Sequence, residues 1–168
     1  GTYSAVTGSA GDMLDHVNWQ DVIAFTGSSD TGLFIRSREN ILKHNVRVNV
    51  EADSLNAAVL GADLKRESET YDLFLQEAVR DMTQKAGQKC TAIRRILVPK
   101  DMLDEVREDL INEVSGIRAG NPTEKGVRVG PLATAGQLRD AKEGLERLSG
   151  CTKMVYGDGG RGNLAGID

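Results

Sequence analysis

Hydrophobic and polar residues follow two different periods along this chain, and the periods predict its elements. Residues 21–25 form a short apolar run typical of a strand buried in a parallel sheet. A glycine-containing turn follows at residues 27–32, and the next residues have the pattern of a helix. Residues 46–50 alternate apolar and polar side chains and lead directly to Glu51. We therefore expect a strand, a glycine turn, a helix and a second strand.

The rest of the chain is dominated by the helical period. Apolar residues recur at three- and four-residue steps over residues 67–86, which predicts an amphipathic helix ended by Gly87. Helices alternating with strands predict an α/β layer architecture with parallel pairing. The other expected elements are strands at residues 57–60, 93–98 and 152–156 and helices at residues 102–117 and 138–148.

Composition narrows the class of protein. The chain has 168 residues, of which 39% are hydrophobic and 27% charged, as in a globular protein. Its net charge of −4 argues against nucleic acid or an anionic membrane as a partner. No apolar run is long enough for a membrane span, and two cysteines make no disulfide framework, so we expect a cytoplasmic protein. Cysteine and histidine spacing predicts no metal site. The chain opens at Gly1 in mid-pattern, and we expect a segment of a longer polypeptide.

Cys90 is the first candidate for chemistry. Most cysteines are small buried hydrophobes, but the polar neighbours of Cys90 do not resemble a core segment. Lys85 and Lys89 would favour the reactive thiolate if they face the sulfur. Cys90 is therefore a candidate nucleophile, whereas we interpret Cys151 as structural.

Glu51 is the candidate base. A glutamate at a strand end is usually solvated, but a partly buried one could take a proton from water near neutral pH. Asp53 competes for the role at the same strand end. The turn Gly27-Ser28-x-x-x-Gly32 could hold a pyrophosphate through backbone amides and the Ser28 hydroxyl, although a plain strand-to-helix turn uses the same residues.

Taken in chain order, the glycine turn, Glu51 and Cys90 resemble features of the aldehyde dehydrogenase superfamily. Its members carry a Phe-Thr-Gly-Ser-x-x-x-Gly cofactor turn, a strand ending in the general-base Glu, and a Gly-Gln-x-Cys segment with the nucleophile. The matching runs here are residues 25–32, Glu51 and residues 87–90. Later loops agree at residues 120–122 and 130–132.

Two segments of the chain differ from the usual superfamily sequence and point to one branch of it. Glu51-Ala52-Asp53-Ser54-Leu55-Asn56 replaces the usual Glu-Leu-Gly-Gly-Lys, and residues 85–95 are similarly unusual. Both resemble the dehydrogenase half of bifunctional phenylacetate ring-opening enzymes and the related dehydroadipyl-CoA semialdehyde dehydrogenases. That branch oxidises CoA-linked semialdehydes of aromatic degradation and generally uses NADP.

The resemblance implies a fold, residue roles and partners. It implies the end of a Rossmann-like cofactor domain at residues 1–45 and most of an α/β catalytic domain at residues 46–168. Cys90 would attack the aldehyde, Glu51 would activate water, and the cofactor would be NADP or NAD. It also implies a homo-oligomer. The cofactor-binding residues would be Thr26, Gly27, Ser28, Gly32 and Gln137.

Other family features have no match here, among them the oxyanion-hole Asn and the Lys that contacts the cofactor ribose. We therefore expect this segment alone to lack dehydrogenase activity. Two other classes remain open, a non-catalytic fragment that keeps the fold for assembly and a thiol-redox protein using Cys90. The redox class ranks last because Cys90 has no resolving cysteine nearby.

Overall fold

A computed structural model describes residues 3–157, which form two compact units. The first unit ends at Ser54 and the second begins at Leu55. The domain boundary expected from the sequence lies after residue 45. The difference is one strand, β2, which pairs within the first unit. Residues 158–168 of the expected second domain lie outside the described residues.

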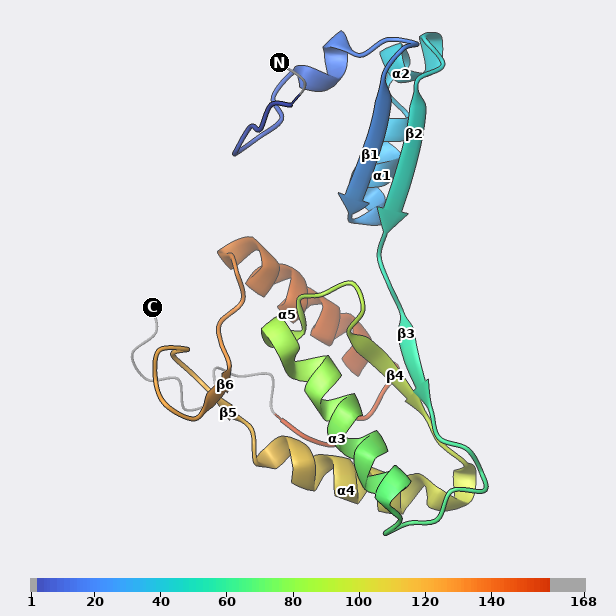
Figure 1. Ribbon diagram of the computed structural model, residues 1–168, viewed down its shortest axis with the longest axis vertical. Coiled ribbons are helices and arrows are strands. Elements are labelled where there is room, and N and C mark those ends of the chain that lie inside the picture. The colour runs from blue at the N-terminus through green and yellow to red at the C-terminus, as the bar shows by residue number, and fades with distance from the viewer. Residues whose placement is uncertain (1–2, 158–168) are drawn as a thin grey trace. The chain divides into compact units, whose positions relative to one another are not determined.

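The first unit is a strand, helix and strand motif (Figure 1). Strands β1 (Val22–Gly27) and β2 (Arg47–Ala52) pair in parallel, in register from Val22 opposite Arg47 to Gly27 opposite Ala52. The order of the predicted elements is confirmed, but β2 runs on through Glu51. Three helical segments complete the unit: η1 (Met13–His16), α1 (Ser29–Arg36) and α2 (Glu39–Lys43).

In the second unit, β3 (Asn56–Val59) pairs in parallel with β4 (Ile93–Leu97), as parallel strands in an α/β layer should. The core is built from Leu60, Tyr71, Leu75 and Val106, so it joins α3 (Glu69–Thr83) to α4 (Leu103–Ser115). Figure 1 shows these two helices adjacent. The remaining elements are η2 (Gln84–Gly87), η3 (Lys100–Met102), the parallel pair β5 (Arg118–Ala119) and β6 (Val127–Val129), and α5 (Ala135–Ser149).

One predicted helix end and one predicted strand are wrong. The helix expected over residues 67–86 ends at Thr83, because Lys85, Ala86 and Gly87 all take left-handed backbone angles, with φ of 52°, 54° and 73°. No strand forms at residues 152–156. Thr152 instead folds back on α5, since its amide and its hydroxyl both donate to the Leu148 carbonyl, at 2.9 and 2.7 Å.

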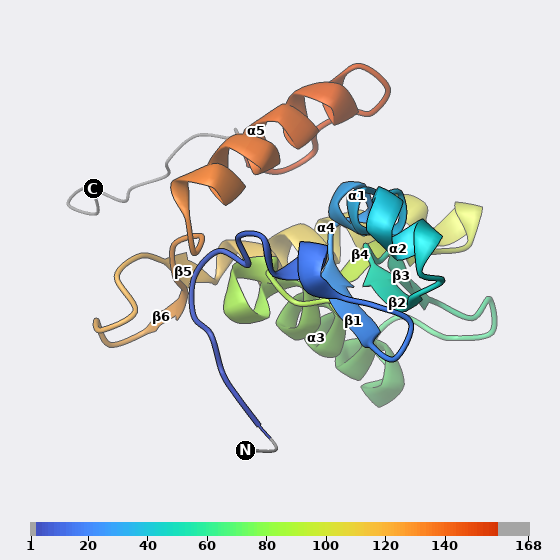
Figure 2. The same ribbon diagram turned by 90° about the horizontal axis from the view of Figure 1, so that it is seen from above.

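Helix α5 follows its predicted apolar period but buries none of its described residues. Figure 2 shows it standing off from α3 and α4. Its apolar side chains are therefore exposed, and Leu148 is 56% accessible. None of the described helices has the length and apolar character that crossing a bilayer requires.

Candidate functional site

Cys90 lies on a tight turn between α3 and β4. Two successive backbone turns shape the segment: Gln88 donates its amide to the Lys85 carbonyl at 3.0 Å, and Ala92 donates to the Lys89 carbonyl at 3.2 Å. Cys90 sits inside the second turn and is exposed. The turn therefore presents the sulfur-bearing residue at the surface of its unit.

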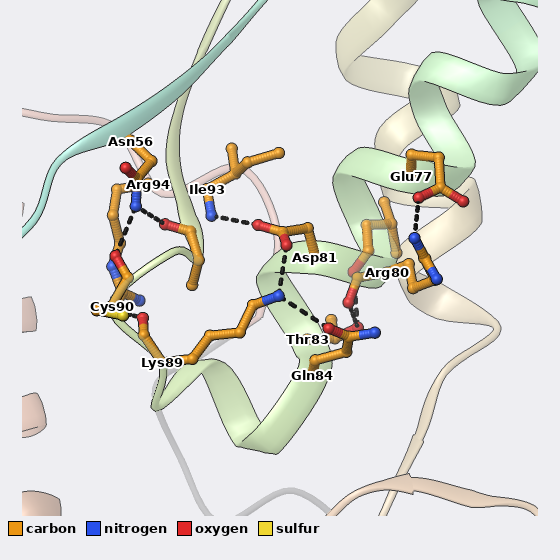
Figure 3. Close-up of polar contacts among 12 residues, drawn as sticks. Asn56, Glu77, Arg80, Asp81, Thr83, Gln84, Lys89, Cys90, Ile93 and Arg94 are labelled. Carbon is orange, nitrogen blue, oxygen red and sulfur yellow. Dashed lines mark hydrogen bonds and ion pairs between the residues drawn. The ribbon is translucent and has the colours of Figure 1, made fainter.

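Asp81 of α3 holds this turn from the helix side (Figure 3). Its carboxylate accepts a hydrogen bond from the Lys89 ammonium at 2.5 Å and another from the Ile93 backbone amide at 2.8 Å. The hydrogen bond from Lys89, followed by the one from the Ile93 backbone, lowers the pKa of Asp81 below its ordinary value. Asp81 thus bonds to the chain on both sides of Cys90.

Asn56 at the start of β3 holds the same turn from the strand side. Its side-chain amide donates to the Cys90 carbonyl at 2.7 Å and to the Ala92 carbonyl at 3.3 Å. Gln88 adds a third attachment, because its Oε1 accepts the Ala133 amide at 2.9 Å. The turn is therefore hydrogen-bonded to a helix, a strand and the loop before α5.

Lys89, considered from the sequence as a cation that favours the thiolate, is hydrogen-bonded through its ammonium to Asp81 and, at 2.8 Å, to Gln84 Oε1. Cys151, the other cysteine, is also exposed, and its sulfur lies 3.5 Å from the Leu148 carbonyl. Neither cysteine is in a disulfide.

Glu51 and Asp53, the two candidate bases, have different surroundings in the first unit. Glu51 pairs with Thr26 in the β1–β2 register, and its side chain is exposed rather than partly buried. Within the described residues, its carboxylate forms no hydrogen bond or ion pair. Asp53 follows β2 in a left-handed conformation with φ of 47° and accepts the Ser29 hydroxyl at 2.5 Å. Asp53 is thus engaged at the start of α1, whereas the Glu51 carboxylate stays available.

The strand and the helix around the glycine segment are as expected, but the turn expected over residues 27–32 is shorter, because residues 29–32 already belong to α1. Ser28 caps α1: its hydroxyl oxygen accepts the Thr31 amide at 3.2 Å, and the hydroxyl donates to Thr31 Oγ1 at 2.9 Å. The Ser28 hydrogen is therefore committed to Thr31. Gly32 is buried where a Cβ would lie 2.6 Å from Val50 Cγ1, so the glycine allows α1 to pack closely on β2.

Gln137, expected as a cofactor contact, lies in the first turn of α5, where its amide donates to the capping hydroxyl of Thr134 at 3.1 Å. Its side chain is exposed. Among the described residues, no group of three or more His, Cys, Asp or Glu side chains is arranged to hold a metal ion.

Sequence reasoning missed two residues, Asn56 and Asp81. Asn56 is the last residue of the segment that begins at Glu51. No local pattern identifies it, because its hydrogen-bond partners lie in a distant segment. Asp81 lies between Val79 and Met82, two members of the apolar stripe of the predicted helix. A carboxylate next to an apolar stripe is the feature that could have identified Asp81, because partly buried charges in proteins are usually paired.

Comparison with known proteins agrees with these motifs. A family model described as "Aldehyde dehydrogenase family" matches residues 1–166. A 3,4-dehydroadipyl-CoA semialdehyde dehydrogenase of Aromatoleum evansii is 45% identical over 157 residues, which cover 94% of this chain and 30% of that protein. A putative aldehyde dehydrogenase family 7 member A1 homolog of Dictyostelium discoideum is 32% identical over 76% of this chain and 24% of its own length. The chain thus spans under a third of these relatives.

Solved structures show the same fold. Aldehyde dehydrogenase C of Pseudomonas syringae, crystallised with NAD+ and octanal, superposes with a TM-score of 0.78 at 24% identity, over 93% of this chain and 32% of that one. An aldehyde dehydrogenase of Brucella melitensis biovar abortus gives 0.71 at 26% identity, over 90% and 31%. The expected α/β fold class is confirmed. With the family model matching almost every residue, the chain belongs to the aldehyde dehydrogenase family.

Proposed function

We propose that this chain carries the nucleophile and the general base of an NAD(P)-dependent aldehyde dehydrogenase. The observation that carries the proposal is the Cys90 turn, which presents an exposed cysteine and is hydrogen-bonded to Asp81, to Asn56 and, through Gln88, to the loop before α5. A turn fixed on three sides keeps a nucleophile in one geometry, which a cysteine of merely structural use does not need.

Cys90 supplies the covalent chemistry. Its thiolate sulfur attacks the aldehyde carbon and forms a carbon–sulfur bond, and the carbonyl oxygen becomes the oxyanion of a thiohemiacetal. The backbone N–H of Cys90 donates to that oxygen. Loss of the aldehyde hydrogen as hydride leaves a thioester on Cys90. NADP or NAD, when bound, supplies the hydride acceptor for this oxidation.

Glu51 completes the reaction as the base. Its carboxylate takes a proton from water, the resulting hydroxide adds to the thioester carbonyl, and the sulfur leaves as the regenerated thiolate. The products are a carboxylic acid and the resting enzyme. The absence of a partner for Glu51 among the described residues suits this role, because its oxygen atoms remain available to water.

The first unit fits the pyrophosphate part of the cofactor through its backbone. The start of a helix just after a strand offers unpaired amides and the positive end of the helix dipole. Thr26 and Gly27 end β1, Ser28 caps α1, and Gly32 lies in the first turn of that helix. Because its hydrogen is committed to Thr31, we assign Ser28 this capping role ahead of direct donation to phosphate. Gln137 is proposed as a ribose contact.

For the substrate, we propose a CoA-linked semialdehyde of aromatic degradation, such as an intermediate of phenylacetate breakdown. Support comes from the 45% identical relative, whose name specifies 3,4-dehydroadipyl-CoA semialdehyde. A cytoplasmic enzyme is proposed with it, since Cys90 must stay reduced to act. We also propose that the enzyme works as a homo-oligomer.

Alkylation tests the proposed nucleophile on the 168-residue chain itself. Both cysteines are exposed, so accessibility alone predicts similar labelling and Cys151 serves as the internal control. We expect iodoacetamide to modify Cys90 at least about tenfold faster than Cys151 or a model thiol, because a catalytic nucleophile is more reactive than a cysteine of structural use. Peptide mass spectrometry gives both rates. Equal and slow labelling of the two cysteines would favour a non-catalytic fragment instead.

A further inference from the structure

Asp81 occupies a point where a helix, a turn and a strand converge (Figure 3). One carboxylate oxygen accepts the Lys89 side chain, the residue just before Cys90, and the other accepts the backbone amide of Ile93, the first residue of β4. Both oxygens therefore bond to the segment that contains Cys90, one before the thiol and one after it.

The pair is shielded to a degree that surface ion pairs are not. The Asp81 and Lys89 side chains are 27% and 16% exposed. On the same helix, Glu77 pairs with Arg80, and these side chains are 49% and 56% exposed. The Glu77–Arg80 pair joins residues three positions apart on one helix, so it fixes nothing outside α3, and exposed pairs of this kind contribute little to stability.

The turn needs such an attachment because of its backbone. Lys85 and Ala86 adopt left-handed conformations that residues with a Cβ avoid, and such conformations persist where surrounding contacts over-determine them. Asp81 accepts a hydrogen bond from the Ile93 amide and Asn56 donates one to the Cys90 carbonyl, so the two side chains hold the residues that follow, up to the start of β4. Asp81 is the charged member of this set.

We propose that Asp81 is a positioning residue for the Cys90 nucleophile. It acts in part through its ion pair with Lys89, the residue before Cys90. The proposal rests on the proposed function, in which Cys90 attacks the aldehyde. Asp81 does not contact the substrate. It keeps the turn in the conformation that presents the sulfur. A small displacement of a reacting atom costs a large factor in rate, up to about 100-fold for roughly 1 Å.

The first readout is hydrogen exchange in the 168-residue chain. Asp81→Ala removes both attachments, whereas Asp81→Asn keeps an oxygen that can accept the Ile93 amide but loses the charge that holds Lys89. We expect faster exchange across residues 85–93 in both variants, and more in Asp81→Ala. Glu77→Gln is the matched control, because it also breaks an ion pair of α3 but should leave exchange in the turn unchanged.

The second readout is turnover, assayed with 3,4-dehydroadipyl-CoA semialdehyde and NAD or NADP in a polypeptide of the relatives' full length that carries these residues. We expect Asp81→Asn and Lys89→Met each to lower kcat about tenfold or more with little change in KM. The double variant should be no slower than either single variant, because residues that act as one unit are not additive. The Glu77→Gln variant should keep wild-type kcat and a similar unfolding midpoint.

The outcomes separate this proposal from the one on which it rests. A wild-type Cys90 that labels no faster than Cys151 counts against the proposed function. A reactive Cys90 together with wild-type kcat in Asp81→Asn and Lys89→Met overturns the positioning role alone. Fully additive losses of kcat in the double variant also overturn the positioning role. So does a loss of kcat that only follows a lowered unfolding midpoint, if Glu77→Gln shows the same lowered midpoint.

Discussion

At the scale of single residues, Gly32 has a structural use separate from the cofactor contact inferred for it. It is buried on α1, and an added Cβ would lie 2.6 Å from Val50 Cγ1 on β2. Atoms that close must move apart, so any side chain at this position pushes the helix from the strand. A glycine in this turn thus serves packing as well as any ligand, and its presence alone does not establish a phosphate site.

Replacing Gly32 by Ala should lower the free energy of unfolding by about 1–3 kcal/mol, the usual cost of overpacking. Urea unfolding followed by circular dichroism measures it. Gly144→Ala in α5 is the control, because its added Cβ meets nothing closer than 3.9 Å and should be neutral or stabilising. A Gly32→Ala variant as stable as the wild type would mean that α1 does not pack on β2 this closely.

Single residues also mark what local patterns could predict of the candidate site. Cys90 and Glu51 were found from their immediate neighbours and from the family motifs. Asn56 and Asp81 were missed because each acts through partners in another segment, 34 and 12 positions away in their respective hydrogen bonds to Cys90 and Ile93. Local sequence patterns do not encode such pairs.

At the scale of elements, α3 and α4 are joined by one polar cluster beside the core. Asp109 of α4 accepts the Tyr71 hydroxyl at 2.6 Å and the Arg66 guanidinium at 2.8 and 3.0 Å. The Arg66 hydrogen bonds lower the pKa of Asp109, and burial, with the bond to Asp109, raises the pKa of Tyr71 to about 12. Glu105 lies 4.0 Å from Arg66 at the edge of the cluster.

This cluster predicts a pH-dependent effect of Asp109→Asn. A carboxylate whose pKa is depressed on folding stabilises the native state above its unfolded value, and the contribution is lost as pH falls through the folded value. The variant should therefore be less stable than the wild type near neutral pH, and the gap should close as the pH falls below the ordinary pKa of an aspartate and through the lowered value of Asp109. Urea unfolding across this range measures the difference. A gap between them that stays constant with pH would refute the role given to the Asp109 charge.

Helical elements were more predictable than strands. The apolar period located α3, α4 and α5, since a repeating stripe extends over many residues. Their ends shifted where particular contacts decide, as at Thr83, where left-handed residues follow the helix. The β5–β6 pair was not predicted, because two and three residues carry no period and their parallel partner lies beyond a loop. The wrong strand at residues 152–156 was inferred from composition without a pairing partner.

At the scale of the whole molecule, the chain is two units with one proposed chemical role in each. The first unit contributes Glu51 and the glycine turn, and the second contributes Cys90 on its fixed turn. The family assignment covers both units, since the family model matches residues 1–166. The proposed function therefore divides the chemistry between two residues, in which Cys90 bears the acyl group and Glu51 drives its release.

The most direct test is the fate of the acyl group in Glu51→Gln, made in a polypeptide of the relatives' full length that carries these residues. Without the base, the thioester should form but not hydrolyse. Mixing the variant with the proposed substrate class, tested as 3,4-dehydroadipyl-CoA semialdehyde, and NAD or NADP should yield one equivalent of reduced cofactor and then stall, with the acyl group on the peptide containing Cys90. Wild-type turnover in Glu51→Gln, an acyl group on another residue, or an undiminished burst in Cys90→Ser would contradict the account.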